Sequence, residues 1–97
     1  MALNRPKKNV TRIINSDNLF TDSVELSGHF NVSISGTWSG ILTVRRSFDA
    51  GNTWFDVKTF TTNAQEYGFE PEAGVFYCIG SKVGEFTSGA TTVRLSQ

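Results

Sequence analysis

The segment 47–54, Ser-Phe-Asp-Ala-Gly-Asn-Thr-Trp, constrains the fold of this chain more than any other. The carboxylate of Asp49 can accept hydrogen bonds from backbone N–H groups of its own turn. Gly51 can adopt the positive φ that such a turn needs, and Trp54 then opens the next strand with a large apolar side chain. The spacing therefore predicts the tip of a β-hairpin that is stabilised by its own polar groups.

The same segment fits the pattern Ser/Thr-x-Asp-x-Gly-x-Thr-Trp/Phe and resembles the Asp-box of sialidases and other β-propellers. In those families the box lies away from the active site and has a structural role. The resemblance implies that role for Ser47, Asp49, Gly51, Thr53 and Trp54, and it implies that the Trp54 side chain lies in the core. A chain of 97 residues with one copy is too short for a propeller, which needs several four-stranded blades. A sialidase-like enzyme is therefore not expected.

The length and composition predict a single all-β domain. Eight Phe, two Trp, two Tyr and nine Gly favour short strands joined by tight turns. No segment has the i, i+3, i+4, i+7 apolar spacing of an amphipathic helix. About seven or eight strands, with a turn signal roughly every ten residues, predict an antiparallel β-sandwich. Jelly-roll and immunoglobulin-like Greek-key topologies both fit this pattern.

Alternating apolar and polar residues make 29–35 the clearest half-buried strand. The glycine-bracketed segment 36–40 predicts a turn with Trp38 at its tip. Strands over 41–48 and 53–61 then complete a three-stranded meander. Trp38 either stacks on a sugar or anchors a protein interface, or it folds back and caps the core.

Glycine and proline at other positions predict two further interruptions between strands. Gly28 is expected to end the strand that precedes it, and Glu-Pro-Glu-Ala-Gly over 70–74 is expected to form a turn. The apolar run 75–79 predicts a central strand. Arg46 falls on the apolar side of its strand, so we expect it at the strand end or with its guanidinium reaching outward.

The net charge is zero, but the charge is unevenly distributed. The segment 1–12 has no acidic residue, whereas 13–97 has five basic and nine acidic side chains. The basic residues of the first segment are Arg5, Lys7, Lys8 and Arg12. We therefore divide the chain into a basic N-terminal arm, 1–12, and a single sandwich domain, 13–97. The arm either contacts an acidic subunit or nucleic acid, or is a solvated terminus.

The inventory of reactive side chains predicts no enzyme. Cys78 is the single cysteine and lies in an apolar run, where a buried, unreactive thiol is expected. One histidine, His29, cannot build a zinc site, and no phosphate-binding glycine loop precedes a helix. Three glutamates flank a proline turn and are expected to be solvated: Glu66, Glu70 and Glu72. We predict no catalytic, metal or cofactor residues, and no signal peptide or membrane span.

Four segments together resemble small proteins encoded among the virion structural genes of tailed bacteriophages. They are 36–40, 45–54, 72–77 and 87–97, and the resemblance extends over about residues 28–97. The resemblance implies a virion component: a head-decoration (cement) protein, with a head–tail or tail accessory protein as the alternative. It implies no catalytic residue.

The same resemblance sets expectations for partners and location. The partners would be the major capsid protein or other virion subunits, contacted through the basic arm, and the chain would act as a dimer or trimer on the capsid surface or in the head–tail region. Nucleic acid is not expected, because the body of the domain is acidic and repels phosphate. A small carbohydrate-binding module that uses Trp38 is the rival from a different functional class.

Overall fold

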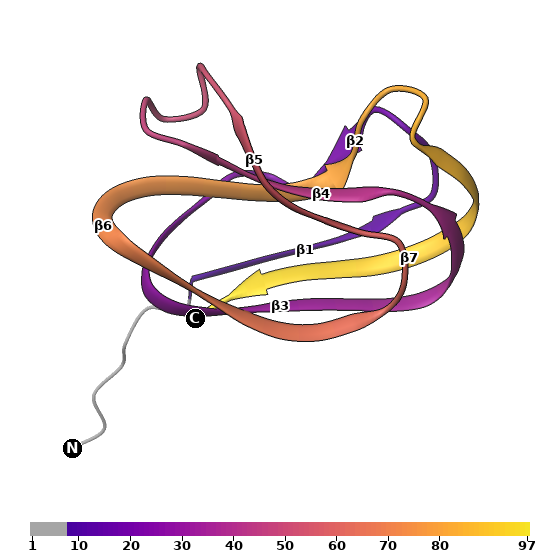
Figure 1. Ribbon diagram of the computed structural model, residues 1–97, viewed down its shortest axis with the longest axis horizontal. Helices are drawn as coiled ribbons and strands as arrows, with labels where there is room; N and C mark the ends of the chain where they lie inside the picture. The colour runs from indigo at the N-terminus through magenta and orange to yellow at the C-terminus, as the bar shows by residue number, and fades with distance from the viewer. Residues whose placement is uncertain (1–7) are drawn as a thin grey trace.

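The computed structural model describes residues 8–97, and this part of the chain contains seven antiparallel strands and no helix (Figure 1). The strands are β1 (Asn9–Ile14), β2 (Leu19–Phe20), β3 (Val24–Gly40), β4 (Leu42–Ser47), β5 (Phe55–Phe60), β6 (Ala64–Ser81) and β7 (Phe86–Ser96). The predicted all-β, sandwich-like antiparallel fold is confirmed.

The strands form one sheet with the order β1-β7-β3-β6-β4-β5, and β2 pairs with β6 outside this path. β3 pairs with β6 along one edge and with β7 along the other. The second half of β6 also pairs with β4. The long strands curve, so the sheet folds over itself (Figure 1). Side chains from the inner surfaces then meet in one core, as in a β-sandwich.

The core collects the inward-facing residues of six strands. Its buried members are Ile14, Leu26, Phe30, Val32, Ile34, Leu42, Val44, Phe60, Val75, Tyr77, Ile79, Val93 and Leu95. The rings of Phe30 and Tyr77 meet with their centroids 4.8 Å apart. The run 75–79 lies between β3 and β4, which confirms its predicted central position.

The expected meander is wrong, because β3 pairs with β6 and β7 instead of with β4. The segment 36–40 is not a turn but the end of β3, and it runs antiparallel to β7. Gly36 has φ +136°, and a Cβ atom there would lie 2.5 Å from the carbonyl oxygen of Ala90. Glycine therefore permits β3 and β7 to approach each other closely here. In the sequence alone, a glycine that allows such an approach cannot be told from a glycine that forms a turn.

The expected break at Gly28 and turn at 70–74 are also wrong. Both lie inside long strands, facing each other across a register shift. Leu26 pairs with Val75, whereas Gly28, with φ +73°, pairs with Glu70. The residues between Glu70 and Val75 are therefore accommodated as an irregularity in β6. The ladder between β3 and β6 resumes on both sides of this irregularity, as at a β-bulge.

The boundary between the N-terminal arm and the domain lies earlier in the chain than the expected position after residue 12. β1 begins at Asn9, so the last part of the segment 1–12 belongs to the sheet. Asn9 pairs with Ser96 in β7, and the carbonyl of Lys8 accepts a hydrogen bond of 2.9 Å from the backbone N–H of Gln97. Arg5 and Lys7, and the expectations attached to them, lie outside the described residues.

Candidate functional site

The turn that joins β4 to β5 forms a closed set of hydrogen bonds. The Ser47 hydroxyl donates to Asp49 Oδ1 at 2.7 Å and accepts from the backbone N–H of Gly51 at 2.9 Å. Asp49 Oδ1 also accepts from the backbone N–H of Thr53 at 2.8 Å. The Ser47 and Thr53 donors hold the pKa of the Asp49 carboxyl below its usual value. The polar groups of the motif are therefore used inside the turn.

The backbone φ angles in this turn agree only in part with those that the sequence predicts. Gly51 has the expected positive φ, +95°, but Ala50 also adopts a left-handed conformation with φ +60°. Alanine at that position carries no sequence signal for it. Trp54 is half-buried and lies outside the core cluster, so its expected place in the core is wrong. Its ring instead lies 5.3 Å from the guanidinium carbon of Arg45, which also lies 3.7 Å above the Phe20 ring.

Trp38 is held inside the domain. Its Nε1–H donates to Asn63 Oδ1 at 2.8 Å, and its ring stacks on Phe86 at 6.4 Å with an interplanar angle of 8°. The half-buried indole packs against the core. Asn63 is fixed in turn, because its amide donates to the carbonyl of Gly36 at 3.0 Å. Of the two alternatives for Trp38, this geometry supports the core cap.

Of the four basic residues assigned to the arm, the structure describes Lys8 and Arg12, and these two have different contacts. Arg12 lies in β1, and its Nη1 donates to the carbonyl oxygen of Phe20 at 2.9 Å. Lys8 is half-buried next to the C-terminal Gln97. The geometry of the domain thus gives Arg12 a contact inside its own chain, and partner binding by the basic arm stays a prediction.

An ion pair with a buried carboxylate joins β4 to β6, and the sequence did not reveal it. Arg46 Nη1 donates to Glu70 Oε1 at 2.8 Å, and the Glu70 side chain is only 1% exposed. The Tyr77 hydroxyl donates to the same oxygen at 2.6 Å, and the backbone N–H of Glu72 donates to Oε2 at 3.1 Å. The expectation that Glu70 is solvated is wrong. The available signal was Arg46 on the apolar side of its strand, since a buried guanidinium requires an acidic partner.

The remaining reactive side chains are separated from one another. Cys78 is buried, which raises the pKa of its thiol, and Arg45 Nη2 lies 3.7 Å from Sγ. His29 instead packs against Phe69, with ring centroids 4.9 Å apart. Glu66 forms an exposed ion pair of 2.6 Å with Lys58. Within residues 8–97, no three histidine, cysteine or acidic side chains lie close enough together to hold a metal ion.

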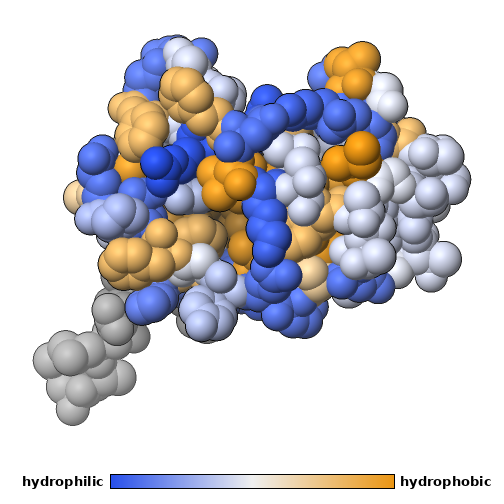
Figure 2. Space-filling view, in the orientation of Figure 1, coloured by the Kyte–Doolittle hydropathy of each residue, from blue (hydrophilic) through white to orange (hydrophobic). Residues whose placement is uncertain are grey.

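Apolar side chains are exposed at the β4–β5 hairpin, at the end of the sheet that β5 forms (Figure 2). Phe48, Phe55 and Val57 are 49%, 53% and 49% exposed. We call these three residues the β5 surface. The rings of Phe48 and Phe55 lie 6.1 Å apart, and the Arg46 guanidinium lies 4.9 Å from the Phe48 ring. With Asp56 these residues line a shallow pocket of about 430 Å³. Alternation along β5 puts Phe55 and Val57 on one face, and the structure shows that this face is open to solvent.

Comparison with protein families, with curated proteins and with solved structures found no match to this chain. The part of the chain that the structure describes has no helix of the length and apolarity needed to cross a membrane.

Proposed function

We propose that this protein is a non-enzymatic structural component of a bacteriophage virion, a decoration or cement protein that attaches to other virion subunits. The resemblance of residues 28–97 to small virion proteins motivates the proposal. The structural observation that supports it best is the β5 surface, where three large apolar side chains are about half exposed on an edge strand and on the turn that precedes it. Such clusters on a small domain are typical of protein–protein contacts.

The β5 surface is suited to docking because its support is rigid. Phe48 lies within the hydrogen-bonded turn, and Phe55 follows it directly. Arg46, whose guanidinium lies over Phe48, is held by the buried carboxylate of Glu70. A surface ordered before binding loses little conformational entropy when a partner covers it. In this proposal the Asp-box turn is structural, and its role is to fix the residues that bind.

The small area of the β5 surface predicts that a single copy of the chain binds its partner weakly. Covering apolar area contributes about 25 cal/mol per Å², so three half-exposed side chains supply only a few kcal/mol. A dimer or trimer presents several such surfaces at once, and the high effective concentration of the later contacts strengthens attachment. Oligomerisation is therefore part of the proposal. The head–tail or tail position remains the alternative location, with the same surface in use.

Quantitative mass spectrometry of purified phage particles tests the proposed function. The proposal expects the chain in many copies and in a fixed ratio to the major capsid protein. A head–tail or tail position would instead give few copies in a fixed ratio to the tail or neck proteins. A chain that is made during infection but is missing from washed particles would refute both.

A further inference from the structure

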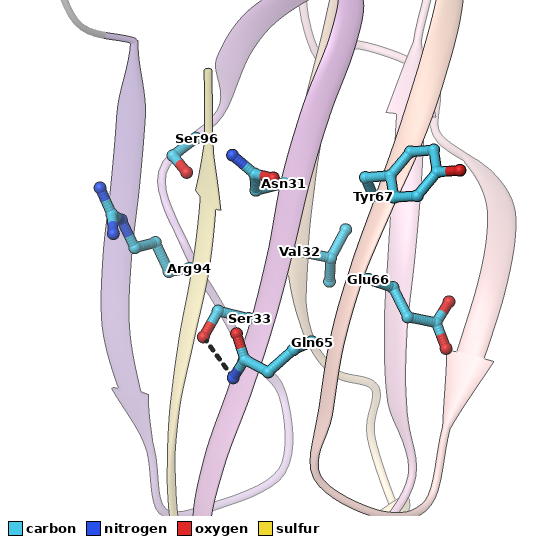
Figure 3. Close-up of a pocket in the computed structure, with 8 residues that line it drawn as sticks. All are labelled: Asn31, Val32, Ser33, Gln65, Glu66, Tyr67, Arg94 and Ser96. Atoms are coloured by element: carbon cyan, nitrogen blue, oxygen red, sulfur yellow. Dashed lines mark hydrogen bonds between the residues drawn. The ribbon is translucent and has the colours of Figure 1, made fainter.

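A polar groove crosses the outer surface of three neighbouring strands, away from the β5 surface. It lies on β7, β3 and β6 and has a volume of about 330 Å³. Figure 3 shows Asn31 and Ser33 in the middle, between side chains from the two flanking strands. The strand register creates this arrangement, because Asn31 pairs with Tyr67 and with Ser96. The volume falls in the range of small-ligand sites, roughly 300–1,000 Å³.

Tyr67 at the edge of this groove is a large aromatic side chain that the fold does not bury. It is 77% exposed, more than any other large hydrophobic residue that is exposed in the described part of the chain. Phe69, two residues further along β6 on the same face, is 58% exposed, and the His29 ring packs against both. A row of rings on a flat strand face offers amphipathic stacking surfaces.

The polar groups in the groove offer hydrogen bonds in fixed directions. Gln65 Nε2 donates to the Ser33 hydroxyl at 2.9 Å, so the amide is held in place (Figure 3). Asn31 supplies a second amide, and Arg94 supplies guanidinium N–H donors; both residues are exposed. Planar amides and guanidinium groups are suited to pairs of adjacent hydroxyls, which donate and accept at once.

The charge in the groove is nearly balanced. Arg94 is the cation that lines it, and Glu66 at the rim is paired with Lys58 at 2.6 Å. A single-stranded nucleic acid also stacks on aromatic rings, but it needs several cations along its phosphates. The groove therefore favours a ligand that is amphipathic, rich in hydroxyls and close to neutral.

We propose that this groove binds an oligosaccharide. One sugar of the chain stacks on Tyr67, and hydroxyls of this and neighbouring sugars bond to Asn31, Gln65 and, on the far side of the groove, Arg94 (Figure 3). Phe69 extends the stacking surface for a further sugar. The inference is separate from virion attachment, which uses the β5 surface, and it moves the carbohydrate site from Trp38, which caps the core, to β6.

Binding of the full-length protein to sugars tests this site. The probes are cellohexaose, laminarihexaose, chitohexaose and a panel of immobilised bacterial polysaccharides. We expect at least one to bind, and Tyr67→Ala to weaken that binding roughly tenfold or more, the scale of one lost contact of moderate strength. Tyr67→Phe keeps the ring and should stay within about threefold of the wild type, and Arg94→Gln should weaken binding.

The controls separate this site from the rest of the surface. Val57→Ala lies on the β5 surface and should leave sugar binding unchanged. Because Tyr67 and Arg94 are exposed, their variants should melt at the temperature of the wild type. The proposal is overturned if no probe binds, if Tyr67→Ala binds as the wild type does, or if an oligothymidine competes with the sugar for the groove.

Discussion

Arg46 on β4 and Glu70 on β6 form an ion pair of 2.8 Å whose carboxylate is buried. This contact fixes the strand that leads into the hairpin against the middle of the longest strand. It also positions the guanidinium over Phe48, at the edge of the proposed docking surface. Core stability and the shape of the β5 surface therefore depend on the same pair.

Loss of this pair should destabilise the domain strongly. Glu70→Ala leaves Arg46 and the Tyr77 hydroxyl without their acceptor, and we expect a loss of about 2–4 kcal/mol. The lower part of that range allows for the 35% exposure of the Arg46 side chain, which lets water solvate it. Urea denaturation measures the change. The matched control is Glu66→Ala, which removes an exposed ion pair and should cost less than about 1 kcal/mol. Equal losses for the two variants would contradict the structural role of Glu70.

Tyr77 should lose its proton only at very alkaline pH. Burial, together with the hydrogen bond to Glu70, raises the pKa of its phenol to about 12. The neutral phenol therefore stabilises the fold fully below the unfolded pKa of about 10, and this contribution disappears as pH rises from there to about 12. Absorbance at the phenolate band follows the titration in Tyr67→Phe, where Tyr77 is the remaining tyrosine. A midpoint near the ordinary value in a chain that is still folded would show that the phenol is not buried against a carboxylate.

Asp49 should stabilise the turn in a pH-dependent way. Its folded pKa is lowered by the Ser47 and Thr53 hydrogen bonds, so its contribution is present above the unfolded pKa of about 4 and is lost as pH falls below it. Asp49→Ala should lower Tm at neutral pH by about 4–8 °C. Asp49→Asn should show a smaller decrease in Tm between about pH 7 and pH 3 than the wild type. Calorimetry tests both, with Asp22→Asn, an exposed acid outside the turn, as the control. An unchanged Tm in Asp49→Ala combined with loss of particle attachment would mean that the motif binds a partner directly.

The sequence predicted the features that depend on short stretches of chain. The hydrogen bonds of Asp49 all lie within the turn 47–54, so the spacing of the motif was sufficient to predict them. Composition and alternation were likewise sufficient for the all-β fold. Gly36 shows the limit: its local signal fits a turn, but a neighbouring strand uses it as a point of close approach.

The candidate sites depend on contacts that the local sequence does not encode. Arg46 and Glu70 are 24 residues apart, and their contact follows from the pairing of β4 with β6. The groove needs Asn31 to pair with Tyr67 and Ser96 in strands distant in sequence. A shift by one residue would send Tyr67 to the other face of the sheet. The exposure of the β5 surface likewise depends on the position of β5 at the end of the strand order.

Residues 1–7, the part of the basic arm that precedes β1, should contribute to attachment without supporting the fold. Deletion of residues 1–7 retains Lys8 and the whole of β1, so Tm should be unchanged. The deletion removes Arg5 and Lys7, and we expect weaker attachment to particles as contacts with acidic subunits are lost. Replacing both residues with Gln is the matched control for charge. If the shortened chain saturates particles at the wild-type concentration, the arm is a solvated terminus.

Attachment of variants to particles that lack the chain tests the central claim most directly. Purified wild-type protein, Phe55→Ser and Ile13→Thr are titrated onto such particles, and the bound copies are counted by mass spectrometry. Ile13 is 59% exposed and lies on β1 at the opposite end of the sheet, so it is the matched control for loss of an exposed apolar side chain. The account predicts that the wild type and Ile13→Thr saturate the particles at the same concentration, whereas Phe55→Ser needs roughly tenfold more, the consequence of losing about 1.4 kcal/mol of contact. Equal saturation by all three proteins, or no binding by the wild type, would contradict attachment through the β5 surface.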